Sequence, residues 1–361
     1  MTFKQTRSAI GSAAVIVALA GFLGLATAPG APAQAQKTWK LTSYVPVGSG
    51  TWNIYMKPFI DRVDDLTDGE VKIKGYSVGV LASPFDAWKK VQQGVADICF
   101  CFPAFAANAD PANAILAGLA GGMNTDVWMH WLYYADGGEL WRGFRRDTGD
   151  LFPVITGVGP TEIFLHSNRP VRSLADLKGM KIRTTGAWAD ILKQLGASPT
   201  VLAPADIYTA LERGVIDATE FITPATNYKL GYHKIAKYII IPGYHQPSSA
   251  NEVVFRGKDW DKLSAKNRSR ITMAAKLSGF DTYMRLGMQD FEAMKKLRAG
   301  RNVFIRLPDD VKNKINELAR VWTADQAKKQ AAKGNMWMQK LQDSYWAFFD
   351  TFTKYGDYRV Q

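Results

Sequence analysis

Arg183 is the residue whose type and position best suit the binding of a small anion. It ends a short predicted strand at 180–183, and a Thr-Thr-Gly turn separates it from a predicted helix at 187–195. Ligands of α/β folds bind at the carboxyl ends of strands. A guanidinium there can hold a carboxylate through two parallel hydrogen bonds. Arg183 is therefore a candidate carboxylate clamp; the alternative is a solvated charge at a strand end.

Three glutamates occupy comparable places. Glu220 follows a predicted strand and precedes Phe221, Glu162 begins a predicted strand at 162–166, and Glu252 lies in the apolar segment 251–255. Carboxylates at such positions can bind a cation or accept hydrogen bonds from a ligand. The alternative is an ordinary surface acid.

The chain lacks the sequence motifs of common catalytic sites. It contains no G-x-S-x-G, S-x-x-K, H-E-x-x-H or G-x-x-x-x-G-K sequence. The histidines do not show the spacing of metal ligands, and each is interpreted as a structural residue: His130, His166, His233 and His245. We therefore expect a protein that is not an enzyme.

Two segments, 84–99 and 204–219, carry the same pattern 120 positions apart. Each has a Pro, an acid two residues later, an aromatic, an aliphatic and a Gly, followed by a short apolar run. Pro favours a helix start, and Gly accepts the left-handed conformation after the last turn. One helix-to-strand unit used twice predicts two similarly built α/β lobes with a ligand cleft between them. Two ordinary amphipathic helices with common capping residues are the alternative.

The remaining pattern extends this α/β prediction. Alternating segments at 38–44 and 71–76 indicate strands, whereas the chain after Ser264 is mostly helical. We expect a two-lobed fold with a hinge and several chain crossings, because no low-complexity linker separates the lobes. Lobe I is assigned to residues 36–157 plus 226–258. Lobe II with the C-terminal helices is assigned to 158–225 plus 259–361.

The first 35 residues have the pattern of an export signal. A positive start precedes an apolar stretch, and Ala33-Gln34-Ala35 is a typical cleavage site. We therefore expect a mature chain that begins at Gln36 and is soluble in the periplasm. The loss of Lys4 and Arg7 lowers the net charge from +12 to +10. These charges are spread along the chain, so nucleic acid is not an expected partner.

The cysteines and aromatic residues complete the sequence-based predictions. Cys99 and Cys101 lie two residues apart in an apolar run, and we expect buried free thiols because a disulfide within one strand has poor geometry. The 11 Trp and 18 Phe residues suggest an aromatic-lined cleft. Tyr44, Phe102 and Tyr208 are the candidate aromatic contacts.

Four segments of the sequence form a distinctive combination: Asp176–Arg183, Asp206–Phe221, Tyr228–Tyr238 and Ile241–Gly243. Together they resemble the periplasmic solute-binding proteins of tripartite ATP-independent periplasmic (TRAP) transporters, and most closely the branch that binds 2-oxo acids. The resemblance implies that Arg183 holds the ligand carboxylate. It also implies a bridging metal ion, Ca²⁺ or Na⁺, held by Glu220, the Phe221 carbonyl and the residue at position 162. That residue is commonly Gln and is Glu162 here, with Glu252 as a further candidate ligand.

The expected function is capture of a small 2-oxo or 2-hydroxy monocarboxylate and its delivery to a TRAP membrane permease. Because Glu162 stands where other branches have a second Arg, a doubly clamped, sialic-acid-like ligand is disfavoured. An aromatic carboxylate or polyol is the alternative ligand. A periplasmic metal-dependent enzyme and a ligand-sensing adaptor are the alternative classes. The helical tail is also compatible with a homodimer, since some relatives swap a C-terminal helix.

Overall fold

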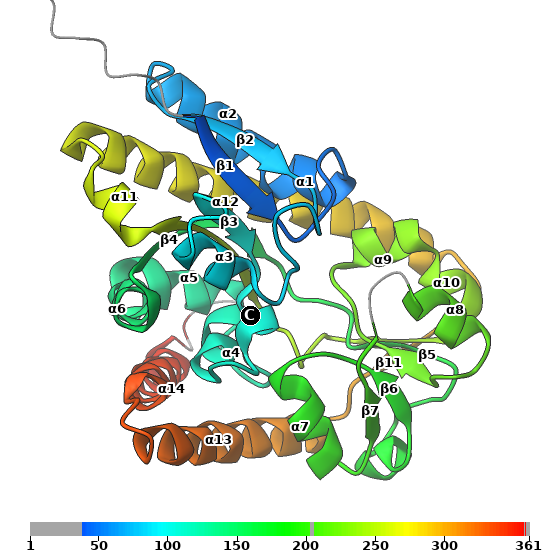
Figure 1. Cartoon of the computed structure of the whole chain (residues 1–361). Helices are drawn as coiled ribbons and strands as arrows, with labels where there is room; N and C mark the ends of the chain where they lie inside the picture. The colour runs from blue at the N-terminus through cyan, green and yellow to red at the C-terminus, as the bar shows by residue number, and fades with distance from the viewer. Residues whose placement is uncertain (1–37, 203–205, 357, 359–361) are drawn as a thin grey trace, which may run out of the picture. The chain divides into compact units, whose positions relative to one another are not determined.

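The computed structural model describes residues 38–202, 206–356 and 358. The signal-like segment 1–35 lies outside these residues. The strands form two separate mixed sheets, and helices surround these sheets (Figure 1). The predicted two-lobed α/β fold is confirmed.

The first sheet has five strands in the order β2-β1-β3-β10-β4. Strands β1, β2 and β3 are parallel, and β10 runs antiparallel to both β3 and β4. The strands are β1 (Thr38–Ser43), β2 (Lys72–Tyr76), β3 (Ile98–Cys101), β4 (Leu151–Gly159) and β10 (Ser249–Arg256).

The second sheet has six strands in the order β11-β9-β5-β8-β6-β7. Strand β5 runs antiparallel to both of its neighbours, whereas the other pairs are parallel. The strands are β5 (Leu165–Ser167), β6 (Lys181–Arg183), β7 (Ser198–Thr200), β8 (Ala218–Thr219), β9 (Tyr238–Ile241) and β11 (Val303–Arg306).

Helices connect and cover the strands. Those before β6 are α1 (Gly50–Tyr55), α2 (Lys57–Leu66), α3 (Ala87–Gln92), η1 (Pro103–Ala106), α4 (Ala112–Ala117), α5 (Thr125–Tyr134), α6 (Gly137–Gly149) and η2 (Leu174–Leu177). Those after β6 are α7 (Ala187–Gln194), α8 (Ile207–Glu212), α9 (Pro224–Leu230), α10 (Tyr232–Ile235), α11 (Gly257–Asp261), α12 (Ala265–Arg298), α13 (Asp309–Ala331) and α14 (Trp337–Tyr355).

The two sequence repeats form the same local unit. The first gives α3 and β3, and the second gives α8 and β8, with Gly94 and Gly214 at positive φ after each helix. The Asp before each strand makes the same contact with a neighbouring strand. Asp97 Oδ2 accepts a hydrogen bond from the backbone N–H of Lys40, and Asp217 Oδ2 accepts one from the backbone N–H of Lys181, both at 2.8 Å. The predicted repeat is therefore confirmed in structure. Helix α3 begins at Ala87 instead of Pro84, after a turn in which the Ser83 hydroxyl donates to Asp86.

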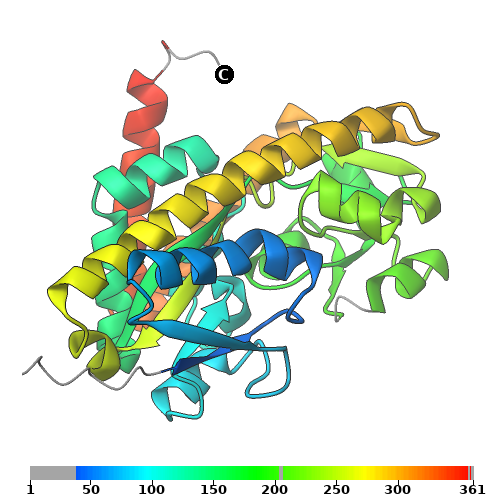
Figure 2. The same ribbon diagram turned by 90° about the horizontal axis from the view of Figure 1, so that it is seen from above.

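The long helix α12 contacts elements of both sheets (Figure 2). On one side, Arg62 of α2 donates to Ser278 and Asp281 of α12. On the other, Asp290 accepts from the Ala225 N–H in the first turn of α9 at 2.8 Å. A single rigid element thus ties the two lobes together.

Two features of the chain path differ from the expected lobe boundaries. Strand β9 pairs in the second sheet, although residues 226–258 were assigned to lobe I. Helix α14 packs against α4, α5 and α6, although residues 259–361 were assigned to lobe II. Both differences come from long-range pairing, which the local pattern does not encode.

The prediction of free thiols is wrong. Cys99 and Cys101 form a disulfide on β3, with Cα atoms 5.7 Å apart. Their side chains share one face of the strand, and both residues are buried in a cluster with Trp88 and Val91. The Cα separation lies within the usual range for a disulfide.

Candidate functional site

The candidate site lies at one edge of the second sheet, where four chain segments meet. Strands β6 and β8 are parallel, so Arg183 and Glu220 lie at the same end of their strands. Strand β5 is antiparallel to β8 and β9. The loop before β5, which carries Glu162, and the loop after β9, which carries His245, therefore reach this same edge.

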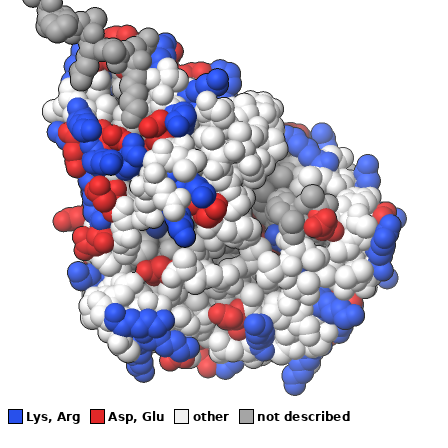
Figure 3. All heavy atoms as spheres, in the orientation of Figure 1, with Lys and Arg blue, Asp and Glu red and all other residues white. Residues whose placement is uncertain are grey.

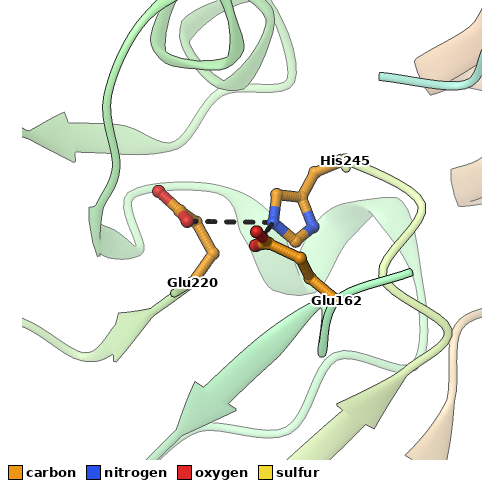
Figure 4. Close-up of side chains that lie close together, drawn as sticks. All are labelled: Glu162, Glu220 and His245. Carbon is orange, nitrogen blue, oxygen red and sulfur yellow. Dashed lines mark hydrogen bonds and ion pairs between the residues drawn. The ribbon is translucent and has the colours of Figure 1, made fainter. Parts of the chain in front are cut away.

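Glu162, Glu220 and His245 converge at this edge. One donor atom from each lies within 4.8 Å of the other two. His245 Nε2 is 3.3 Å from Glu162 Oε2 and 3.8 Å from Glu220 Oε2 (Figure 4). All three side chains are nearly enclosed, with exposed fractions of 12%, 11% and 2%. The predicted pair of glutamates is brought together, with a histidine added.

Gly243 makes this convergence possible. A Cβ atom at this position would lie 2.2 Å from the Glu162 carbonyl oxygen, so only glycine lets the two backbones approach this closely. The Glu162 N–H also donates to the Gln246 carbonyl at 3.3 Å. These contacts hold His245 and Glu162 beside each other.

Arg183 is buried directly next to Glu220. Its Nε and Nη2 donate to the Leu202 carbonyl at 3.2 Å, and Nη1 lies 3.4 Å from both the Glu220 carbonyl and Oε1. Nη2 keeps a second N–H, and the contacts to Glu220 are long. A ligand carboxylate can take up these donors. The guanidinium also lies over the Phe221 ring at 5.5 Å.

Burial shifts the ionisation of the site. It raises the pKa of Glu162 to about 8, with Arg183 acting in the opposite direction. It lowers the pKa of His245 to about 4, opposed by Glu220. At neutral pH the imidazole of His245 is therefore neutral and Glu162 holds a proton, and a cation would stabilise the ionised form of Glu162.

This donor set fits a metal ion. Calcium ligands lie 2.3–2.6 Å from the ion, so two ligands on opposite sides are about 5 Å apart. The three donor atoms lie within that span. The Phe221 carbonyl follows Glu220 directly; it accepts a hydrogen bond from Asn227 Nδ2 and keeps a second lone pair. Ile222, next in the chain, has φ +22°, an uncommon value for a β-branched residue.

Aromatic side chains surround the donors. Phe164 and Trp188 lie with ring centroids 5.7 and 5.9 Å from that of His245. The indole N–H of Trp188 is buried and has no hydrogen-bond partner among the described residues. A buried donor without a partner is unfavourable unless a ligand accepts from it. Trp188 is therefore a further candidate ligand contact.

The three other predicted aromatic contacts lie in different surroundings. The Tyr44 hydroxyl donates to Asn251 Oδ1 at 2.7 Å, and its ring packs on Phe100 in the first lobe. Phe102 follows β3 in the same lobe and is half-buried. Tyr208 lies on α8 against Gly231. None of these contacts joins them to Glu162 or Glu220.

Glu252 does not belong to the site, and its assignment as a metal ligand is corrected. It is fully buried on β10, in the first sheet. Its Oε1 accepts from Trp88 and Arg145, and its Oε2 accepts from Trp141 and Arg145. Both oxygens are thus used in a structural ion pair. Strand β10 pairs with β3 on one side and with β4 on the other, and the local sequence did not indicate this buried position of Glu252.

Sequence reasoning missed His245 and Trp188. His245 lies two residues after the Ile241–Gly243 motif that supported the family resemblance, and this closeness was the available signal. Trp188 lies just after the Thr-Thr-Gly turn that follows Arg183. Both were hidden because a lone His or Trp is usually structural.

The surface is compatible with an anionic ligand but shows no extended basic tract on the face drawn in Figure 3, where Lys and Arg are interspersed with Asp and Glu. Within the described ranges, no helix combines the length and apolar character required to cross a bilayer.

Known proteins are similar to this chain in sequence and in fold. A monocarboxylate 2-oxoacid-binding periplasmic protein of Nostoc sp. is 26% identical over 298 residues, which cover 81% of this chain and 80% of that protein. A TRAP periplasmic solute-binding protein from Colwellia psychrerythraea, with bound calcium and pyruvate, superposes with a TM-score of 0.80 at 21% identity. One from Pseudoalteromonas atlantica, with bound sodium and pyruvate, gives 0.79 at 23%. Each structure matches 89% of this chain and 96% of its own.

The family itself follows from a match over most of the chain. The model of the DctP family, described as bacterial extracellular solute-binding protein, family 7, matches residues 43–330. This range includes strands of both sheets and every donor of the candidate site. The sequence resemblance is thereby confirmed: the chain belongs to the DctP family of bacterial extracellular solute-binding proteins.

Proposed function

We propose that this protein is the periplasmic receptor of a TRAP transporter for a small monocarboxylate that carries an oxo or hydroxy group beside the carboxylate. The convergence of Glu162, Glu220 and His245 next to Arg183 carries the proposal. The guanidinium binds one end of the anion. Glu162 and Glu220 would hold a cation beside the ligand's oxygens.

The bridging ion is Ca²⁺ or Na⁺ in this proposal. Hard carboxylate and carbonyl oxygens dominate the donor set, and two relatives hold these ions together with pyruvate. When bound, the ion supplies the positive charge that pairs the ligand with Glu162 and Glu220. The chain's own residues then orient the anion: Arg183 by its N–H groups and Trp188 by its indole N–H.

The same geometry supports binding without chemical change. His245 lies beside the two carboxyl groups, and the rings of Phe164 and Trp188 pack near its imidazole. The proposed sequence of events is capture, closure of the two lobes and release to a membrane permease. An export signal at residues 1–35 and a periplasmic location are part of this proposal.

A thermal-shift screen of organic acids, each with and without Ca²⁺, tests the ligand class. A ligand at 100 times its dissociation constant should stabilise the fold by about 2.7 kcal/mol. Pyruvate, lactate and longer 2-oxo acids should stabilise more than the matched acids without the second oxygen. An equal response to both sets would refute the chelate, and aromatic carboxylates in the same screen test the aromatic surroundings of the site.

Recovery of the ligand tests the absence of chemistry. The protein is incubated with a stoichiometric amount of the best ligand and denatured, and the ligand is measured by mass spectrometry. Unaltered ligand supports a receptor. Turnover above the buffer control would assign the protein to a metal-dependent enzyme instead.

A further inference from the structure

Helix α12 exposes a continuous apolar stripe that the ligand site does not use. Six large side chains on this helix are about half exposed or more: Met273 (51%), Leu277 (48%), Phe280 (61%), Met284 (51%), Met288 (64%) and Phe291 (59%). They recur at intervals of four and three residues. Phe291 lies 18 positions after Met273, which is about five turns of an α-helix. The stripe therefore runs straight along one face.

The opposite face of α12 packs against the core of the protein. Ile271, Ala274, Ala275 and Leu286 pack into the first-lobe core, and Ala293 and Leu297 are buried further along. The stripe is thus in addition to what the fold needs. Exposed apolar patches of this size on one element mark interaction surfaces in soluble proteins.

The order of residues in the stripe is nearly symmetric. Met273 and Phe291 lie nine residues before and after Thr282, and Phe280 and Met284 lie two residues before and after it. Leu277 lies five residues before Thr282, and Gly287 lies five residues after it. A two-fold interface needs this kind of self-complementary surface, since each residue meets its mirror position on the partner.

We propose that two copies of this chain associate through α12, with the two helices antiparallel and the two-fold axis between Phe280 and Met284, level with Thr282 on the buried side of the helix. Phe280 of each copy then meets Met284 of the other, and Met273 meets Phe291. Leu277 packs over the partner's Gly287. A Cβ added at Gly287 meets no atom of its own chain within 4 Å, so the space above it is open.

The area of the stripe favours a second copy as the occupant. Six half-exposed side chains of this size offer about 500–600 Å² per copy, and the stems of flanking residues bring this close to the roughly 800 Å² of a standard interface. Helix α12 carries eight Lys and Arg residues and three Asp and Glu residues. A basic amphipathic helix can also bind an anionic lipid surface, so binding to lipid vesicles is measured beside dimerisation.

A groove next to the stripe adds to this fit. It lies between α9 and α12 and is lined mainly by apolar atoms of Ala225, Tyr228, Met288 and Ala293, with Glu292 and Lys296 at its sides. In the antiparallel arrangement, the partner's Met273 lies next to Phe291 and beside this groove. The groove thus offers space for the Met273 side chain of the partner at each of the two ends of the interface.

Sedimentation equilibrium of the exported chain, without ligand, tests the proposal. The wild-type chain should dimerise with a measurable Kd, and Phe280→Asp should raise that Kd at least ~100-fold. Val321→Asp is the matched control, because Val321 is an exposed apolar residue on α13 (46%) away from the stripe. Its Kd should equal that of the wild type. Far-UV circular dichroism checks that each variant is folded.

Gly287→Leu separates this pairing from other uses of the stripe. It enlarges the apolar surface, yet it should raise the dimer Kd at least ~10-fold because it occupies the space of the partner's Leu277. The exchange Leu277→Gly with Gly287→Leu should restore dimerisation. A monomer at all concentrations, or a dimer that Phe280→Asp and Gly287→Leu leave intact, would overturn the proposal. Binding to phosphatidylglycerol vesicles that rises with Gly287→Leu would also overturn it, in favour of a lipid surface.

Discussion

Glu162 and Glu220 lie close enough to share a cation, and this closeness is costly without one. Two ionised carboxylates at short range repel each other by several kcal/mol in a shielded site. Burial raises the pKa of Glu162 to about 8, so this carboxyl is protonated at neutral pH and the repulsion is relieved. The ligand-free site therefore holds a proton where the loaded site would hold a metal ion and an anion.

Arg183→Lys should weaken ligand binding although it keeps the charge. Lysine cannot reproduce the contacts of Nε and Nη2 with Leu202 and offer a forked pair to a carboxylate at the same time. The expected loss is roughly 1.5–3 kcal/mol, or ten- to a hundred-fold in affinity. Isothermal calorimetry on the folded variant measures it. Unchanged affinity would remove Arg183 from the ligand site.

His166 should make stability fall as the pH falls. It is fully buried on β5, neither ring nitrogen has a hydrogen-bond partner within the described residues, and burial lowers its pKa to about 3. The unfolded chain binds a proton near pH 6.5 and the folded chain does not, so stability rises with pH between these values. From pH 7 to pH 5 this group should cost roughly 2 kcal/mol.

Urea unfolding of the wild type and His166→Leu at both pH values isolates this contribution. Glu162, with its raised pKa, acts in the opposite direction, so only the difference between the two proteins is informative. The variant should lose less stability on acidification. Parallel pH profiles would show that the folded chain can protonate His166.

At the scale of single residues, the sequence indicated those whose role depends on a strand end. Arg183 and Glu220 follow short apolar runs, and their position could be predicted without the fold. His245 could not, because its loop reaches the site only through the pairing of β9 with β5. Glu252 was wrongly assigned for the converse reason: its partner Arg145 is 107 residues away in the chain.

At the scale of elements, the repeated helix-to-strand unit was predictable and the loop contacts were not. The unit depends on two local signals, namely Gly after a helix and an acid before a strand. The first is confirmed at Gly94 and Gly214, and the second at Asp97 and Asp217. The approach of the loop after β9 to Glu162 depends on Gly243, which could be interpreted only as a turn residue. The contact itself sets the geometry of the site.

Gly243→Ala should therefore weaken ligand binding and lower stability together. The added methyl group would lie 2.2 Å from the Glu162 carbonyl oxygen, and backbone must move to accept it. Overpacking of this kind costs about 1–3 kcal/mol. Gly50→Ala on α1 is the control, because a Cβ there meets nothing within 4 Å. Thermal unfolding and calorimetry compare the stability and the ligand affinity of the two variants. Equal values for both variants would show that the loop after β9 can move away from Glu162 without loss.

At the scale of the whole molecule, the two lobes are joined through crossings that local patterns do not fix. The chain leaves the second sheet after β9, enters the first at β10, and then spans both lobes in α12. The fold class followed from the repeat, whereas the boundaries required long-range pairing. This arrangement brings the candidate metal donors together at one end of the second sheet.

Metal and ligand binding should therefore be coupled, and the coupling must be reciprocal. If Ca²⁺ raises the affinity for a 2-oxo acid by some factor, the acid raises the affinity for Ca²⁺ by the same factor, since both quantities describe one coupling free energy. We expect a factor of 5–150, or about 1–3 kcal/mol. Calorimetric titrations of each partner, with and without the other, in sodium-free buffer after exhaustive chelation give both factors. The variant Glu162→Gln tests the role of charge in this coupling. It removes one negative charge and keeps an oxygen donor, so it should reduce the coupling factor measured with Ca²⁺ and shift the preference of the site toward Na⁺. If chelation leaves the affinity for the acid unchanged in the wild type, no ion bridges the ligand, and the two glutamates instead accept hydrogen bonds from hydroxyl or amino groups of a different ligand.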